Sequence, residues 1–192
     1  MRYRLIGLLM PVLIVVAACT SEAEAGPDRL AIVDGTGNVS VVSDGQATRI
    51  TDLGNDAVAF QPVWSPNGER LAYVEQSAAT GALVITSPEP EAPSARVEED
   101  TGFFYYAWEP GSERLATLRN ASTGGLLLEL ADIDGALEEV DSGGPLYFSW
   151  EPDGDRLVAH IGADRLDIIA DGATPEPIID NPGGFQSPWW TC

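Results

Sequence analysis

Short apolar runs alternate with turn residues along this chain, and the runs recur in a fixed order around a tryptophan. Residues 60–71, 104–115 and 146–157 align without gaps, with Trp at the fifth position and Arg-Leu at the end. Residues 27–30 match the second half of this motif, and residues 185–189 match its beginning. The tryptophans assigned to the repeat are Trp64, Trp108, Trp150 and Trp189. Their spacing of 44, 42 and 39 residues predicts a repeat unit of about 42 residues.

Each unit is predicted to hold four short strands. The first strand ends at the Trp, and a turn containing Pro follows it. The second strand is expected at 70–75, 114–119 or 156–161, and the third at 83–86, 126–130 or 166–169. Asp-Gly pairs at 44–45, 134–135 and 171–172 are typical of hairpin turns, after which a weaker fourth strand closes the unit.

The second strands are apolar at successive positions, as in Leu71-Ala72-Tyr73-Val74. Because the alternation of a half-buried strand is absent, both faces of the sheet must be covered. A β-propeller covers them, since each four-stranded blade packs between two others. The repeat Trp is predicted to fill the gap between blades, where its indole N–H needs a partner.

The segment Trp64-Ser65-Pro66-Asn67-Gly68, followed by Leu71-Ala72, resembles the WD-like repeat of TolB-type β-propellers, which reads Trp-Ser-Pro-Asp-Gly before an apolar strand. The resemblance covers about residues 27–192. The second unit departs from it at 109–112, and the Gly-His and Trp-Asp pairs of eukaryotic WD repeats are missing. The resemblance implies an all-β propeller with units at 27–56 (partial), 57–101, 102–143 and 144–183, and the start of another at 184–192.

Two arrangements of these units stay open. Four Trp-bearing first strands balance four second strands, so the last strand can pair with the partial first unit and close a ring of four blades. Alternatively, the repeat that breaks off at Cys192 predicts an open arc, part of a larger propeller, since TolB-type propellers often have six blades or more. We expect the open arc, because the repeat motif is cut off at Cys192 and the chain is expected to continue beyond it.

The first 26 residues are predicted to direct export and to lie outside the fold. Residues 1–18 combine Arg2 and Arg4 with an uncharged run from 5 to 18, which is short for a transmembrane span. The run ends Val-Ala-Ala before Cys19, which resembles the lipobox of bacterial lipoproteins, where the Cys carries a lipid. An ordinary signal peptide with a chance Cys is the alternative. Residues 19–26 are interpreted as a tether, so we expect an exported protein anchored to a membrane outside the cytoplasm through Cys19.

Charge and composition exclude several function classes. The 192 residues include 30 acidic and 10 basic ones, all of the latter Arg, and the formal net charge is −20. Nucleic acid is therefore excluded as a partner, because phosphate binding needs a basic face. Two Cys and one His are too few for a thiolate-rich or imidazole-rich site, and neither metal nor cofactor is expected.

Three local features suggest chemistry, and each has a plainer structural interpretation. His160 takes the position of Val74 and Leu118 in the other units, which favours a core role over catalysis. Residues 132–139 resemble half of a Ca²⁺ loop, but the third alternate ligand and the bidentate Glu are missing. The pair at 189–190 is interpreted as an inter-blade Trp with a neighbour rather than as a carbohydrate or peptide platform.

An acid-Arg-Leu tripeptide also recurs, at Arg29, Arg70, Arg114 and Arg156. These side chains either form a ring that binds acidic ligands or make equivalent inter-blade ion pairs and packed Arg stems. The second interpretation is favoured because it explains the repetition without a ligand.

Three functions remain open for such a chain. The leading hypothesis is a lipid-anchored extracytoplasmic β-propeller that binds a protein or peptide and has no catalytic residue of its own. The second is the propeller of a prolyl-oligopeptidase-like serine peptidase whose hydrolase domain lies beyond Cys192, because no Gly-x-Ser-x-Gly motif is present in these residues. The third is a sensor domain that binds a sugar or another ligand at the channel.

Overall fold

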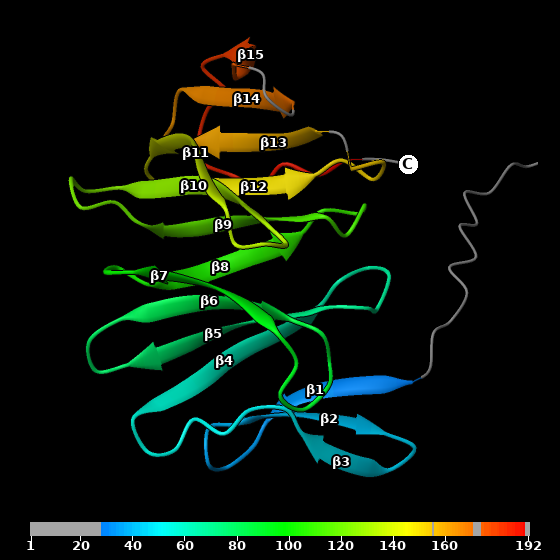
Figure 1. The fold of residues 1–192 in the computed structure, drawn as a ribbon. Coiled ribbons are helices and arrows are strands. Elements are labelled where there is room, and N and C mark those ends of the chain that lie inside the picture. Colours follow the sequence, from blue (N-terminus) through cyan, green and yellow to red (C-terminus); the bar gives the residue numbers. More distant parts are fainter. Residues whose placement is uncertain (1–27, 155, 171–173, 191–192) are drawn as a thin grey trace, which may run out of the picture.

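The computed structural model describes residues 28–154, 156–170 and 174–190, and every regular element among them is a β-strand. Fifteen strands form four antiparallel sheets, and each strand within a sheet pairs with the next one along the chain (Figure 1). None of the described residues forms a helix that is long and apolar enough to cross a membrane. The predicted all-β architecture of blade-like sheets is confirmed.

We number the sheets 1 to 4 in chain order. Sheet 1 has three strands, β1 (Arg29–Val33), β2 (Val39–Ser43) and β3 (Gln46–Arg49). Sheet 2 has β4 (Ala57–Trp64), β5 (Leu71–Ser77), β6 (Gly81–Thr86) and β7 (Ser94–Glu99). Sheet 3 has β8 (Phe103–Trp108), β9 (Arg114–Asn120), β10 (Leu126–Asp132) and β11 (Leu137–Gly143). Sheet 4 has β12 (Leu146–Trp150), β13 (Arg156–Ile161), β14 (Arg165–Ala170) and β15 (Glu176–Asp180).

The core lies between successive sheets, as the continuous apolar strands require. Three clusters of buried side chains fill the gaps between sheets 1 and 2, 2 and 3, and 3 and 4. In β5, Leu71 and Tyr73 face sheet 1, whereas Ala72 and Val74 face sheet 3. Alternate residues of one strand therefore belong to two different cores, and each inner sheet depends on both of its neighbours.

The turn after each Trp has the same backbone in all three full units, although its sequence varies. The residue four places after the Trp has a positive φ in each case: 71° at Gly68, 67° at Ser112 and 87° at Gly154. In each turn this residue's N–H also donates to the carbonyl three residues earlier, at 2.8 to 2.9 Å. In the second unit the Gly of the motif stands one place earlier than in the other units, yet the turn keeps the same position. Ser112 adopts the left-handed conformation that Gly usually supplies.

Asp-Gly pairs form hairpins where the structure describes them. Asp44 and Gly45, with φ of 51° and 73°, join β2 to β3, and both values fit a type I′ turn. The pair at 134–135 joins β10 to β11. The third predicted pair, at 171–172, lies outside the described residues.

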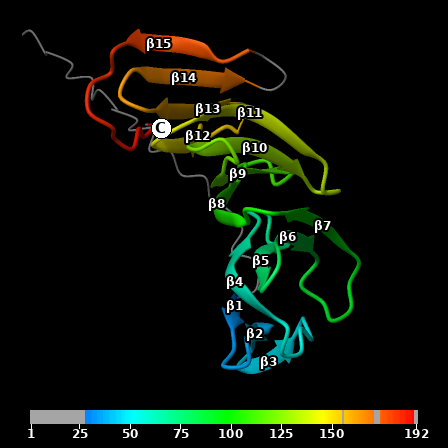
Figure 2. The same ribbon diagram turned by 90° about the vertical axis from the view of Figure 1, so that its left-hand side faces the viewer.

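The four sheets form an open arc. Among the described residues, β1 pairs as a strand only with β2, and residues 185–190 belong to no sheet. Sheets 1 and 4 lie at opposite ends of the molecule in two perpendicular views (Figures 1 and 2). A ring of four blades closed within one chain is therefore not formed, and the expected arc is observed.

Candidate functional site

Tryptophan indoles link each sheet to the one before it. Trp108 Nε1 donates to the carbonyl of Val63, and Trp150 Nε1 donates to that of Ala107, both at 3.1 Å. In each pair the acceptor immediately precedes the Trp of the previous sheet. Trp64 lies in sheet 2, and the sheet before it, sheet 1, has no strand that ends at a Trp. The buried Nε1 of Trp64 has no hydrogen-bond partner among the described residues.

The last Trp in this series is Trp190, and the assignment of Trp189 to the repeat is not supported. Trp190 Nε1 donates to Ser149 O at 3.1 Å, which continues the pattern on sheet 4. Trp189 is 77% exposed. Adjacent residues of an extended chain point to opposite faces, so only one of the two indoles can face sheet 4. The gapless alignment of residues 185–189 is thus displaced by one residue.

The recurring arginines stack on these tryptophans across the gap between sheets. The guanidinium carbon lies 4.6 Å from the ring centroid for Arg29 and Trp64, 5.9 Å for Arg114 and Trp150, and 5.4 Å for Arg156 and Trp190. Such distances fit cation–π contacts. Among the described residues, Arg70 makes no such stacking contact, so the repetition is incomplete in sheet 2.

The carboxylates that form ion pairs with these arginines are not the acidic residues that directly precede them in the acid-Arg-Leu tripeptide. Arg114 pairs with Glu109 at 2.6 Å, and the Nε atom of Arg156 donates to Glu151 at 2.8 Å. Both glutamates directly follow a repeat Trp in their own sheet, so the ion pairs lie within sheets rather than between them. The hydrogen bond from Arg156 lowers the pKa of Glu151. These contacts give Arg114 and Arg156 a structural role in the described part of the chain.

Buried carboxylates form a second set of links that the sequence analysis missed. Glu129 on β10 is nearly fully buried and accepts two hydrogen bonds of 2.8 Å from Arg119, which also lies 3.4 Å from Glu99 of sheet 2. In sheet 4, Arg165 similarly joins the buried Asp167 to Asp141 of sheet 3. Each Arg therefore ties its own sheet to the last strand of the preceding one. No spacing in the sequence indicates the links between sheets, Arg119–Glu99 and Arg165–Asp141, because their members come from different units.

His160 is fully buried in β13 and faces the segment that follows sheet 4. Its Nδ1 lies 2.9 Å from Gln186 O and 3.1 Å from Gln186 N, and its ring lies 5.2 Å from that of Phe185. The equivalent Leu118 packs in the core between sheets 3 and 4. His160 thus occupies a packing position, as its place in the repeat predicts. Cys19, the predicted lipidation site, lies outside the described residues.

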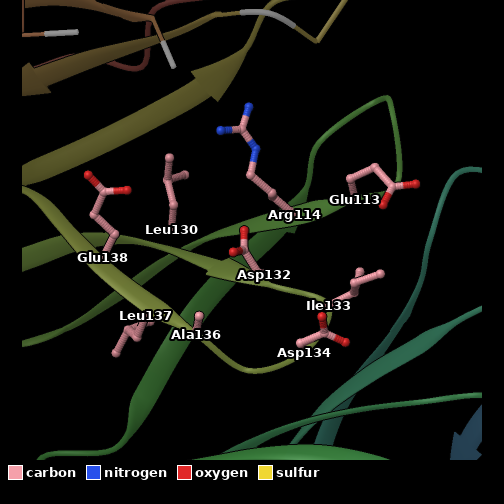
Figure 3. A pocket seen from close by; sticks show the side chains of 9 residues that line it. All are labelled: Glu113, Arg114, Leu130, Asp132, Ile133, Asp134, Ala136, Leu137 and Glu138. Atoms are coloured by element: carbon pink, nitrogen blue, oxygen red, sulfur yellow. The ribbon is translucent and has the colours of Figure 1, made fainter. Parts of the chain in front are cut away.

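A cavity of about 550 Å³ opens beside the hairpin that the sequence suggests as half of a Ca²⁺ loop (Figure 3). Its lining combines apolar side chains with Asp132, Asp134, Glu138, Glu113 and Arg114. Asp132 N donates to Ala136 O at 2.9 Å, which closes the hairpin. Nowhere in the described ranges do three or more His, Cys, Asp or Glu side chains gather as an ion site. The cavity is polar and acidic, and its one cation, Arg114, is paired with Glu109.

Exposed aromatic side chains lie on the first strands of sheets 2 and 3, which we call inner strands and which end at the repeat tryptophans. Phe60 on β4 is 47% exposed, and Phe104 and Tyr105 on β8 are 43% and 37% exposed. The Tyr105 ring lies 6.2 Å from that of Tyr147 on β12, which extends the row to sheet 4. Burial first, and Tyr147 second, raise the pKa of Tyr105. We call these four side chains the inner-strand row.

The sequence contains a signal for the inner-strand row. Phe60 and Phe104 are both four residues before a repeat Trp, and Tyr105 and Tyr147 are both three residues before one. Aromatic residues therefore recur at fixed positions of the repeat. A strand of the Trp motif is expected to be buried, so the sequence alone would place these aromatic side chains in the core. The structure shows that their rings meet solvent.

Comparison with known proteins identifies the architecture. No protein-family model matches the sequence, and no curated protein resembles it closely enough to count as a relative. Among solved structures, the chain is similar to TolB from Acinetobacter baumannii (13% identity, TM-score 0.54, 73% of this chain and 37% of that one). It is also similar to the β-propeller domain of the trilobed protease from Pyrococcus furiosus (14%, 0.58, 80% and 53%). A third similar structure is an uncharacterized protein from Listeria monocytogenes (15%, 0.59, 80% and 50%).

The chain spans between 37% and 53% of the length of these three structures. At such low identities the likeness shows the fold alone. Together with the four meandering sheets and the cores between them, it establishes that this chain is an all-β protein with β-propeller architecture.

Proposed function

We propose that the chain is a non-catalytic binding module that takes up an extended peptide or a protein segment on the inner-strand row. The observation that carries this proposal is the exposure of Phe60 on β4 and of Phe104 and Tyr105 on β8. Exposed apolar surface of this kind usually marks an interaction site. Aromatic side chains are also the anchors that interfaces use most.

The charge of the chain indicates what the partner contributes. With a formal net charge of −20, the protein repels acidic partners and attracts basic ones at long range. The preferred ligand is therefore a polypeptide segment that combines apolar or aromatic residues with Lys or Arg.

A panel of fluorescein-labelled decapeptides, graded in aromatic content and in charge, tests the proposal by fluorescence polarisation. We expect basic aromatic peptides to bind best, and Phe60→Ala or Tyr105→Ala to weaken binding about tenfold, the loss of one interface anchor. Ile178→Ala is the matched control, because Ile178 is 53% exposed but lies on β15, the last strand of sheet 4. Equal losses in all three variants, or no peptide preference, would contradict the proposal.

We further propose that the module is exported and held at a membrane by a lipid on Cys19. The support is the order of Arg2 and Arg4, the uncharged run and Val16-Ala17-Ala18-Cys19 in the sequence. Cys19→Ser is expected to move the protein from the membrane fraction to the soluble fraction, and Cys192→Ser is the matched control that leaves it in place. Mass spectrometry of the mature chain checks for the lipid. Membrane retention of the Cys19 variant would contradict the anchor.

A second candidate is the propeller of a serine peptidase. The chain is similar in fold to acylaminoacyl peptidase (16% identity, TM-score 0.55), of which it covers 30%. The nucleotide sequence after codon 192 distinguishes the two functions. Further Trp-Ser-Pro units followed by a Gly-x-Ser-x-Gly motif support the peptidase, whereas a stop codon after the last repeat supports the binding module.

A further inference from the structure

Arg70 lacks the ion pair that its equivalents in sheets 3 and 4 make. Arg114 and Arg156 each pair with the Glu five residues earlier, which directly follows the repeat Trp. In sheet 2 that position is Ser65, whose hydroxyl group instead bonds to the Asn67 side chain and to the backbone of Arg70. Sheet 2 therefore keeps the Arg of the repeat but has no carboxylate at the position that neutralises it elsewhere.

The guanidinium of Arg70 also lacks the aromatic stacking of the repeat. Arg29, Arg114 and Arg156 each stack on a Trp, whereas Arg70 makes no ring contact, ion pair or side-chain hydrogen bond within the part of the chain that the structure describes. The residue is partly buried. A cation taken partly out of water without a counter-ion is unfavourable, so this uncommitted charge points to an anionic group of a ligand.

Arg70 lines a cavity of about 450 Å³, which is formed by sheet 2 and by the hairpin between β10 and β11 of sheet 3. The hairpin contributes Ile133 and Asp134, which also line the neighbouring cavity of Figure 3. Sheet 2 contributes apolar and hydroxyl-bearing residues, which are Ile85, Pro93 and Ala95, and Thr86, Ser87 and Ser94. The volume is within the range of small-molecule sites.

The second charge of this cavity is Asp134, which is exposed and forms no ion pair in the described ranges. The cavity therefore offers one positive and one negative group, beside an apolar wall. At long range a chain with a formal net charge of −20 repels a simple anion. A zwitterion has no net charge and is not repelled, and it can satisfy Arg70 and Asp134 together.

We propose that this cavity binds a free α-amino acid with an apolar side chain. The ligand carboxylate accepts hydrogen bonds from Nε and a terminal nitrogen of Arg70, as the glutamates of sheets 3 and 4 do from their arginines. The ammonium group faces Asp134, and the side chain packs against Ile85 and Ile133. The site shares no residue with the inner-strand row, so it does not depend on the proposed function.

Titration of the ¹⁵N-labelled full chain, followed by two-dimensional NMR, tests the ligand class with three matched probes. L-leucine is expected to shift the amide signals of residues that line the cavity. Leucinamide has no carboxylate and should bind about tenfold more weakly, or less, because the charged hydrogen bonds to Arg70 are lost. N-acetyl-leucine has no ammonium group and should bind about threefold more weakly, the loss of an exposed ion pair.

Three variants assign the two charges. Arg70→Gln should weaken leucine binding about tenfold or more. Arg49→Gln is the matched control, because it removes the same charge from an exposed ion pair on sheet 1 and should leave binding unchanged. Asp134→Asn should remove the preference for leucine over N-acetyl-leucine, a result that loss of stability alone does not produce.

Ser65→Glu is the sharpest variant, because it places in sheet 2 the residue type that neutralises the Arg in sheets 3 and 4. The added carboxylate should occupy Arg70 and abolish leucine binding, while the dispersed spectrum of the folded chain is retained. Leucine binding that survives Ser65→Glu or Arg70→Gln would overturn the proposal. So would leucinamide or N-acetyl-leucine binding as tightly as leucine, or no shift of the cavity signals with any probe.

Discussion

Trp108→Ala is expected to lower the free energy of unfolding by about 3–5 kcal/mol, the range for large aromatic side chains removed from cores. The indole is 7% exposed, packs in the cluster between sheets 2 and 3, and donates to Val63 O. Truncation leaves a cavity between the two sheets and a carbonyl without its donor. Urea unfolding followed by circular dichroism measures the change.

Two matched variants separate this effect from the general cost of losing a Trp. Trp108→Phe retains most of the packing and loses the hydrogen bond, so it should be affected less than Trp108→Ala. Trp189→Ala removes a side chain that is 77% exposed and should change stability by no more than about 0.5 kcal/mol. If Trp189→Ala were as destabilising as Trp108→Ala, the assignment of the inter-sheet position to Trp190 would be wrong.

Arg119→Leu is the second substitution with a large expected effect, a loss of about 3–5 kcal/mol in unfolding free energy. The side chain of Glu129 is only 3% exposed, and its two hydrogen bonds of 2.8 Å come from Arg119. Removing the Arg leaves a buried carboxylate without its cation, and it also removes the contact with Glu99 of sheet 2. Chemical denaturation of the variant at neutral pH measures the loss.

A double variant and an exposed pair are the controls for this prediction. Arg119→Leu combined with Glu129→Leu removes both charges, and we expect most of the stability to return, as for other buried pairs replaced by apolar residues. Arg49 and Asp34 form an ion pair in which the Arg side chain is 50% exposed, and Arg49→Leu should cost less than about 1 kcal/mol. No recovery in the double variant would show that Arg119 acts mainly through its packing.

The sheets could be predicted from the sequence because their signals are local and repeated. Three aligned Trp motifs and apolar strands such as Leu71-Ala72-Tyr73-Val74 require blades covered on both faces, and the cores between sheets are formed as expected. The turn at Ser112 shows the limit of residue matching. Its sequence departs from the motif, yet its backbone does not, because hydrogen bonds across the turn fix the conformation.

The candidate binding surface was less predictable, because the exposure of its aromatic side chains depends on how the neighbouring sheets are placed. The aromatic residues at the first and second positions of the motif are recognisable in the sequence, but their solvent contact depends on how the inner strands are placed. The choice between Trp189 and Trp190 likewise depends on which of two adjacent indoles faces sheet 4. Arg119 and Glu99 belong to different units, so no periodicity associates them.

The hydrogen bonds of the repeat tryptophans all run in one direction along the chain. In each case the donor belongs to the later segment and the acceptor is a carbonyl of the sheet before it. Tyr106 follows the same rule, because its hydroxyl donates to the carbonyl of Gln61 in sheet 2. A ribosome releases the acceptors before the donors, so the segment that carries each acceptor carbonyl is synthesised before the Trp that donates to it. Assembly of the arc can therefore proceed from the amino-terminal end as the chain is synthesised.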